Sequence, residues 1–317
     1  MELLEHLEMM TRAASMYYIE NITQAAIAKQ LGISRATVAR MLQRARDEGI
    51  VEIRVNTHPG LSVSMEQALR DQFGLQHVRL VMDHADATQQ RSLVARAAAD
   101  LLKRSLRDEL VVAVGMGRNT AAMCQHILPH NHSHAVTFVS ANGGLNHTGE
   151  PINPNDICRC LADRTGGEVV PLMAPGFTDS PDLRTALLAH DQIQSALDMA
   201  RQADLAFIGV GDVHEYTPDV LMGAIPGDDM HRLKQSQAVG DILGAFYDVQ
   251  GRIVQDGIQD RVVALGIDEL AQLPLVVAVA SEPTKAAALL GGLRTGLLSG
   301  LVTTMHLARS ILSLAQA

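Results

Sequence analysis

Aromatic residues are scarce in this chain of 317 residues: they make up 3% of it, and tryptophan is absent. A sugar-stacking lectin surface or a base-stacking binder of single strands is therefore not expected. Three cysteines are too few for a disulfide framework, which agrees with a reducing compartment. Apolar runs approaching the roughly 20 residues of a membrane span are missing, and the start is acidic, unlike a secretory signal. These absences predict a cytoplasmic protein with no membrane partner.

Charge is distributed unevenly along the chain. Residues 1–56 carry seven basic and seven acidic side chains, so the whole net charge of −9 falls on the remainder. Residues 23–46 contain five basic side chains and no acidic one. A basic segment on an acidic globular body is typical of a nucleic-acid-binding head fused to a partner domain. The length also suits two domains, which we place at residues 1–56 and 57–317.

The first 56 residues have the pattern of a helix-turn-helix. Apolar residues at helical spacing predict a first helix ending near Glu20, and two further helices follow at Gln24–Leu31 and Arg35–Glu48. The turn Gly32–Ser34 provides a glycine that can end one helix and a serine that can cap the next. The alternating segment Ile50–Val55 predicts a strand, or wing, that closes the head.

The third helix carries the expected chemistry of this head. A recognition helix presents its first residues to base edges and its later basic residues to phosphates. Arginine suits guanine, threonine suits the thymine methyl, and helix starts suit phosphate. The predicted contacts to double-stranded DNA are Thr23, Gln24, Ser34, Arg35, Thr37, Arg40 and Arg44. The alternative is a small helical bundle with a solvated basic face.

The remaining 261 residues alternate between strand and helix patterns after an apparent break at His58–Gly60 and a helix at Ser62–Phe73. This alternation predicts a doubly wound, mostly parallel α/β sheet with helices on both faces. The expected strands are His77–Met82, Leu110–Gly115, Ala135–Ser140, Glu168–Pro171, Leu205–Val210, Leu275–Ala280 and Leu297–Thr303. The expected helices are Ala87–Leu106, Asn119–Ile127, Asn153–Thr165, Asp191–Arg201, Thr284–Gly292 and Thr304–Ala315.

Glycine-rich or polar residues follow several of these strands. Ligands of such sheets bind beyond the carboxyl ends of the strands, so these residues are expected to meet in one crevice. Glycine lets backbone approach a ligand, and a helix start favours an anion, so a small anionic ligand is expected. The first motif ends in Thr120 where a dinucleotide fingerprint has glycine, so no cofactor is expected, and a plain tight turn is the alternative. The segments are Gly115–Thr120, Asn142–Gly144, Asn153, Gly209–Gly211 and Lys285.

The chain resembles, over nearly its whole length, the SorC-type (sugar-binding, DeoR-like) bacterial transcriptional regulators. The resemblance rests on the following segments: 18–55 (YIENITQAAIAKQLGISRATVARMLQRARDEGIVEIRV), GMGRNT at 115–120, NGG at 142–144, NPNDICRCLADRTGG at 153–167, IGVG at 208–211, AVGDILGAFYDVQGRIV at 238–254 and the Lys285 helix. It implies an effector domain similar to sugar-phosphate isomerases and deaminases, usually assembled as a tetramer. It also implies a repressor or activator of a sugar or polyol operon, switched by a carbohydrate that is expected to be phosphorylated.

The resemblance also implies which residues bind the effector. The phosphate is expected against Gly117, Asn119, Thr120 and the Gly143–Gly144 loop, with Gly115 and Asn142 alongside. The remaining contacts to hydroxyls or phosphate are expected from Asn153, Asp241 and Lys285. The sequence departs from the family before Lys285, where Glu282 adds a negative charge beside the expected phosphate. An unphosphorylated polyol or a different anion is therefore the alternative.

Other constellations carry weaker expectations. His130, His132 and His134 alternate and could ligate zinc in an extended segment, but a solvated loop is the expected reading, and no metal is predicted. Cys158 and Cys160 on one helix point in different directions, which favours core packing over a chelate. A sugar-phosphate isomerase or deaminase with Asp241 as its base is the alternative function, although no partner acid is evident.

Overall fold

In the computed structural model, the described residues are 2–51, 59–128, 135–144, 152–213, 232–233, 235–255 and 257–316. The chain divides into two compact units, Met1–Asn56 and Thr57–Ala317. Within the described ranges, none of the helices has the length and apolar character needed to cross a membrane.

The smaller unit contains three helices: α1 (Glu2–Tyr18), α2 (Gln24–Leu31) and α3 (Arg35–Asp47). Their apolar faces share one core, which includes Met10, Ile27, Val38 and Leu42. The predicted wing at Ile50–Val55 lies mostly outside the described residues, and its described residues, Ile50 and Val51, are not in a strand.

The turn between α2 and α3 follows from its residues. Gly32 adopts a left-handed conformation with φ of 68°, and its N–H donates to the carbonyl of Ala28. Such a φ is strained for residues that have a Cβ, so glycine suits this helix end. Ser34 then caps α3, because its Oγ accepts a hydrogen bond from the Thr37 N–H at 3.0 Å. The predicted helix-turn-helix is therefore confirmed.

The larger unit is built on a seven-stranded sheet in which every neighbouring pair is parallel. The strand order is β1-β10-β9-β5-β2-β3-β4. All seven correspond to strands expected from the sequence. They are β1 (His77–Val81), β2 (Val111–Val114), β3 (Thr137–Ser140), β4 (Glu168–Val170), β5 (Leu205–Ile208), β9 (Val276–Val279) and β10 (Gly300–Thr304).

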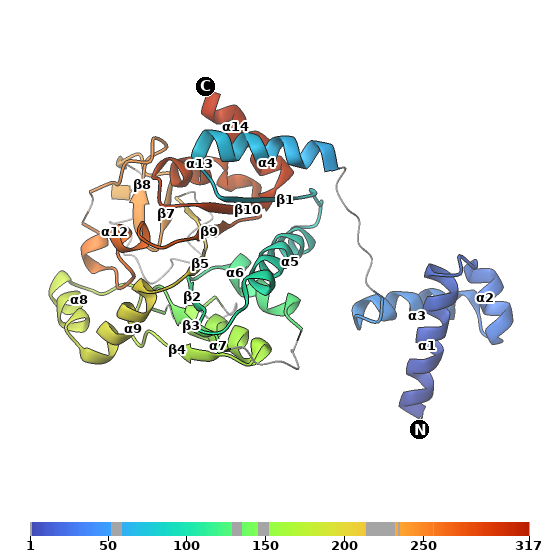
Figure 1. Cartoon of the computed structure of the whole chain (residues 1–317). Coiled ribbons are helices and arrows are strands. Elements are labelled where there is room, and N and C mark those ends of the chain that lie inside the picture. Colours follow the sequence, from blue (N-terminus) through green and yellow to red (C-terminus); the bar gives the residue numbers. More distant parts are fainter. Residues whose placement is uncertain are drawn as a thin grey trace. The chain divides into compact units, whose positions relative to one another are not determined.

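Helices cover both faces of this sheet, as Figure 1 shows. One face packs on α5 (Ala87–Ser105), the 3-10 helix η1 (Met123–His126) and α7 (Pro154–Thr165). The other face packs on α4 (Pro59–Phe73), α9 (Asp191–Arg201), α13 (Ala286–Arg294) and α14 (Met305–Gln316). The doubly wound α/β fold is thereby confirmed.

Three helix expectations need correction. Pro59 and Gly60 were expected in a break, but they open α4, where a proline suits the first turn because it has no N–H to leave unbonded. The helix expected at Asn119–Ile127 is divided into the short α6 (Arg118–Ala122) and η1. The helix expected at Thr284–Gly292 is preceded by a 3-10 turn, η3 (Pro283–Lys285), and α13 begins at Ala286.

Several short elements were not predicted. They are α8 (Pro181–Leu188), the 3-10 helix η2 (Gln259–Arg261), α12 (Ile267–Leu270) and a small antiparallel sheet of β6 (Gly211–Asp212), β7 (Gly240–Ile242) and β8 (Ala245–Tyr247). Strands of two or three residues are too short to show the alternation by which a strand is recognised. This small sheet lies beside the pocket described next.

Candidate functional site

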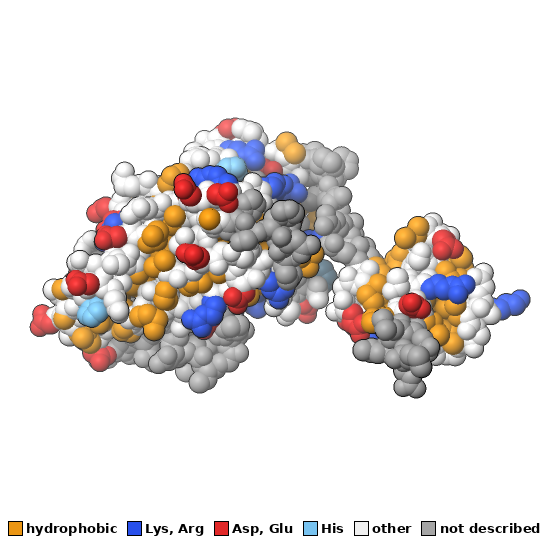
Figure 2. All heavy atoms as spheres, turned by 60° about the horizontal axis from the view of Figure 1, so that its bottom comes forward, with side chains coloured by type: hydrophobic (Ala, Val, Ile, Leu, Met, Phe, Trp, Pro, Cys, Tyr) orange, Lys and Arg blue, Asp and Glu red, His pale blue; other side chains and the backbone are white. Residues whose placement is uncertain are grey.

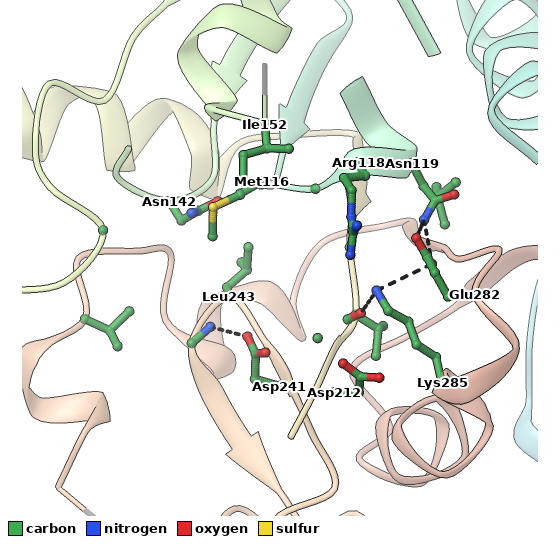
Figure 3. Close-up of a pocket in the computed structure, with 18 of the residues that line it drawn as sticks. Met116, Arg118, Asn119, Asn142, Ile152, Asp212, Asp241, Leu243, Glu282 and Lys285 are labelled. Carbon is green, nitrogen blue, oxygen red and sulfur yellow. Dashed lines mark hydrogen bonds and ion pairs between the residues drawn. The ribbon is translucent and has the colours of Figure 1, made fainter. Parts of the chain in front are cut away.

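The strand order reverses direction between β2 and β5. From β2 the chain proceeds through β3 to β4 on one side, and from β5 through β9 to β10 on the other. The loops after β2 and β5 therefore diverge and leave a crevice at their carboxyl ends, where open α/β sheets bind ligands. A pocket occupies this position (Figure 3).

The pocket draws its lining from loops that are distant in sequence. Loops after β2, β3, β5 and β9 contribute, together with the turn between β7 and β8. Its polar lining residues include Arg118, Asn119, Asn142, Asp212, Asp241, Glu282, Thr284 and Lys285.

Glu282 is in contact with three other side chains. Both of its carboxylate oxygens accept hydrogen bonds from Asn119 Nδ2, at 3.2 and 3.0 Å. Lys285 Nζ lies 3.6 Å from one of these oxygens, and Arg91 Nε from α5 lies 4.0 Å from the other. Burial by itself raises the pKa of Glu282, but the charge of Lys285 and the hydrogen bonds from Asn119 outweigh it and lower the pKa to about 2.

Lys285 is held by two acceptors. Its Nζ donates a hydrogen bond to the Val210 carbonyl at 2.7 Å and forms the ion pair with Glu282. Beside it, Thr284 Oγ1 lies 3.3 Å from Asp212 Oδ2 and donates to it. The loop after β9 is thus fastened to the loop after β5 across the crevice.

Asp241 reaches the pocket from β7. One of its oxygens accepts a hydrogen bond from the Gly244 N–H at 3.0 Å. Burial raises the pKa of Asp241, and the neighbouring carboxylate of Asp212 adds to this, while the Gly244 N–H and Lys285 oppose it. Asp241 is thus a carboxylate with acceptor capacity directed at the pocket.

Five of the ten residues expected to bind the effector line this pocket: Gly117, Asn119, Asn142, Asp241 and Lys285. Of these, Asn142 also has a structural role, because its Oδ1 accepts a hydrogen bond from the Met116 N–H at 3.0 Å. The other five, Gly115, Thr120, Gly143, Gly144 and Asn153, are absent from the described lining.

Contacts within the protein engage most of these five residues. Thr120 is fully buried, and its hydroxyl lies within 3.1 Å of the Gly115 carbonyl and 2.9 Å of the Gly117 carbonyl. Its hydroxyl therefore holds the loop after β2 in shape. Gly143 and Gly144 donate their N–H groups to the carbonyls of Val263 and Ala174, and the Asn153 side chain packs on Gly144.

Pocket residues that the sequence analysis did not select include Arg118, Asp212, Leu243 and Thr284. Arg118 and Asp212 stand within or directly after motifs that were selected, so their neighbourhood gave a usable signal. Leu243 belongs to the turn of the small antiparallel sheet, whose strands are too short to form a recognisable pattern.

The residues expected to contact DNA lie on α3 and at the helix starts of the smaller unit. Arg35, Arg40 and Arg44 are exposed, whereas Val38 and Leu42 face the core. Arg44 forms an ion pair with Glu48. The visible face of the larger unit carries Asp and Glu side chains at several separate places (Figure 2), in line with its negative net charge. The exposed arginines of α3 give this helix a face suited to phosphate and guanine.

The described residues contain no group of three or more His, Cys, Asp or Glu side chains suited to a metal ion. The histidines at 130, 132 and 134 lie outside the described residues. Cys158 is fully buried, in agreement with core packing, and Cys160 is half-buried.

Comparison with known families assigns both units. Residues 57–313 match a family model described as "Putative sugar-binding domain". Residues 3–72 match a model described as a Crp-like helix-turn-helix domain.

Two relatives match along almost the entire chain. The transcriptional regulator LsrR of Enterobacter sp. (strain 638) is 30% identical over 311 residues, covering 97% of this chain and 94% of that protein. The erythritol catabolism regulatory protein EryD of Brucella abortus is 26% identical over 303 residues, covering 95% of each chain.

Solved structures show the same architecture. One is described as the "Putative Sugar-Binding Domain of Transcriptional Repressor from Vibrio fischeri" and superposes on this chain with a TM-score of 0.75. The two are 34% identical, and the match covers 81% of this chain and all of that one. The full-length sorbitol operon regulator SorC of Klebsiella pneumoniae has a TM-score of 0.78 at 24% identity, covering 96% and 98%, and shares the fold.

Proposed function

The chain belongs to the SorC/DeoR-type family of sugar-binding transcriptional regulators, and from this premise we propose that a carbohydrate bound in the pocket switches its affinity for operator DNA. The observation that carries the proposal is the presence, on one chain, of a helix-turn-helix with an exposed basic helix and a polar pocket at the switch point of the sheet. The ligand acts by binding one arrangement of the protein more tightly than another.

The pocket suits a ligand with many hydroxyl groups. Asp212, Asp241 and Glu282 supply carboxylate oxygens, which accept hydrogen bonds from hydroxyl donors. Two relatives are named for erythritol catabolism and for a sorbitol operon, and both compounds are polyols. These features support a sugar or polyol as effector, and the operon under control as one that metabolises it.

The proposed DNA contacts are the seven residues of the smaller unit selected from the sequence. Ser34 and Thr37 stand at the start of α3, where base edges are read, and Arg40 and Arg44 follow on its exposed side. A single head reads only half of a two-fold operator. We therefore propose that the protein acts as a homo-oligomer, a tetramer by analogy with its family.

The test uses the purified full-length chain and fluorescence anisotropy. A labelled duplex from the promoter region next to its own gene is titrated with protein, and an unrelated duplex of equal length is the control. Tighter binding of the promoter duplex, and its release by at least one sugar or polyol, are expected. Equal affinity for both duplexes at every salt concentration would refute the proposal that the protein is a sequence-specific regulator.

The same protein preparation addresses the alternative of an enzyme. Incubation with a panel of sugar phosphates, followed by product analysis, should return the substrates unchanged. Turnover of any of them would favour the isomerase or deaminase reading.

A further inference from the structure

The charges that line the pocket are unevenly balanced. Its described lining contains three carboxylates, Asp212, Asp241 and Glu282, against two basic side chains, Arg118 and Lys285. Arg91 approaches Glu282 from α5 without lining the pocket, and it brings the balance to three basic groups against three carboxylates when all six are ionised. The site therefore offers a phosphate dianion no excess of positive charge.

Two of the pocket groups that would bind a phosphate, Asn119 and Lys285, are already engaged by Glu282. Figure 3 shows Glu282 between Asn119 and Lys285, in contact with both. The Asn119 amide donates to both carboxylate oxygens, and the Lys285 ammonium lies 3.6 Å away with only 16% of its side chain exposed. Arg91 approaches the same carboxylate at 4.0 Å from α5. Two cations and an amide donor thus converge on one anion that belongs to the protein.

This internal anion is difficult to displace. The Glu282 side chain is only 20% exposed and is held by groups from α6, from α5 and from η3. Its low pKa keeps it ionised at neutral pH. A phosphate monoester has a second pKa near 6 and is largely a dianion at pH 7. Close approach of two such anions in a partly buried site is unfavourable.

We propose that Glu282 is a specificity-determining residue that occupies the anion position of the pocket, so that the effector is an uncharged sugar or polyol and its phosphate ester is rejected. The inference rests on the proposed function, because it concerns the effector of the same pocket. It replaces the sequence-based expectation of a phosphorylated effector with the alternative that Glu282 had raised.

The direct test uses inorganic phosphate as the probe. Isothermal titration calorimetry on the wild-type chain should detect no binding of phosphate at millimolar concentration. The Glu282→Gln variant retains an acceptor for Asn119 but loses the charge, and it should gain at least about tenfold in phosphate affinity. Glu168→Gln, a matched change at an exposed position of β4, should behave as the wild type. Wild-type binding of phosphate as tight as that of Glu282→Gln would overturn the proposal.

A second measurement does not depend on the variant folding. Erythritol and sorbitol are each compared with their own monophosphates for thermal stabilisation of the wild-type protein and for release of promoter DNA. The parent polyol of a responding pair should act at a concentration at least about tenfold lower than its phosphate. Release of promoter DNA by the sugar-alcohol phosphates alone would overturn the proposed role of Glu282 but would still support a DNA-binding regulator. Failure of the protein to bind promoter DNA would refute the proposed function itself.

Discussion

Gly211 faces Asp241 across the antiparallel pair β6–β7 and leaves the space that the Asp241 carboxylate occupies. A methyl group at position 211 would overlap Asp241 Oδ1. The carboxylate is short and is fixed by the Gly244 N–H, so it has little freedom to yield. The glycine after β5 therefore positions a polar group of the pocket through its lack of a side chain.

Gly211→Ala should displace the Asp241 carboxylate and abolish the response to effector, while promoter DNA binding is retained. Anisotropy with and without effector measures both properties. The variant should also melt at a lower temperature than the wild type. In the double variant Gly211→Ala/Asp241→Ala the two side chains no longer overlap. The loss of stability in the double variant should therefore be smaller than the sum of the losses in the two single variants. Strict additivity would show that the two positions do not interact.

Arg40→Ala should weaken promoter binding and reduce the dependence of affinity on salt, because it removes one cation from the exposed side of α3. Binding of effector in the other unit should be unchanged. Arg12→Ala makes the same change of charge on α1, outside the helix-turn-helix, and should have a smaller effect. Equal losses in the two variants would place the DNA-binding surface elsewhere.

Glu282 should make the protein sensitive to acid in a defined window. Its pKa is lowered from 4.5 to about 2 in the folded chain, so its contribution to stability is present above about pH 4.5 and is lost as the pH falls toward 2. The full contribution is roughly 3 kcal/mol. Melting curves at a series of pH values should show a higher melting temperature for the wild type than for Glu282→Gln at pH 7. The difference between the two melting temperatures should narrow between pH 5 and pH 3. A difference that stays constant over this range would contradict the ion pair.

The cysteines should differ in reactivity toward a thiol reagent such as DTNB. Burial raises the pKa of Cys158 to about 12, and burial together with the neighbouring Cys160 raises the pKa of Cys124. A buried thiol that stays protonated at pH 8 reacts slowly, because the thiolate is the nucleophile. The native chain should therefore react rapidly at Cys160 alone, and Cys160→Ser should remove this fast phase. All three should react after unfolding in guanidinium chloride, and rapid labelling of native Cys158 would contradict its burial.

Much of the pocket was predictable because it lies at strand ends. The motif Gly115–Thr120 follows a strand made of four consecutive apolar residues, and the alternation of strands and helices requires a mostly parallel sheet. The carboxyl edge of such a sheet is where ligands bind, and Gly117, Asn119 and Lys285 line the pocket at that edge.

The direction of individual side chains was not predictable in the same way. Thr120 stands one residue after Asn119, yet its hydroxyl bonds to backbone carbonyls of its own loop in the interior. Gly143 and Gly144 turn toward Val263 and Ala174, which come from distant segments. A motif shows which residues follow a strand, but the neighbouring loops determine which of them face the ligand.

The sequence by itself determined the local structure: the caps at Thr23 and Ser34, the glycine turn between two helices, and the seven strands of the main sheet. These features depend on residues a few positions apart, so the local pattern contains the information. The tertiary structure decided that Glu282 meets Asn119, 163 residues away, and that Asp241 lies over Gly211. Those contacts depend on the order of the strands in the main sheet and on the pairing of strands that are only two or three residues long. No local sequence pattern specifies either of them.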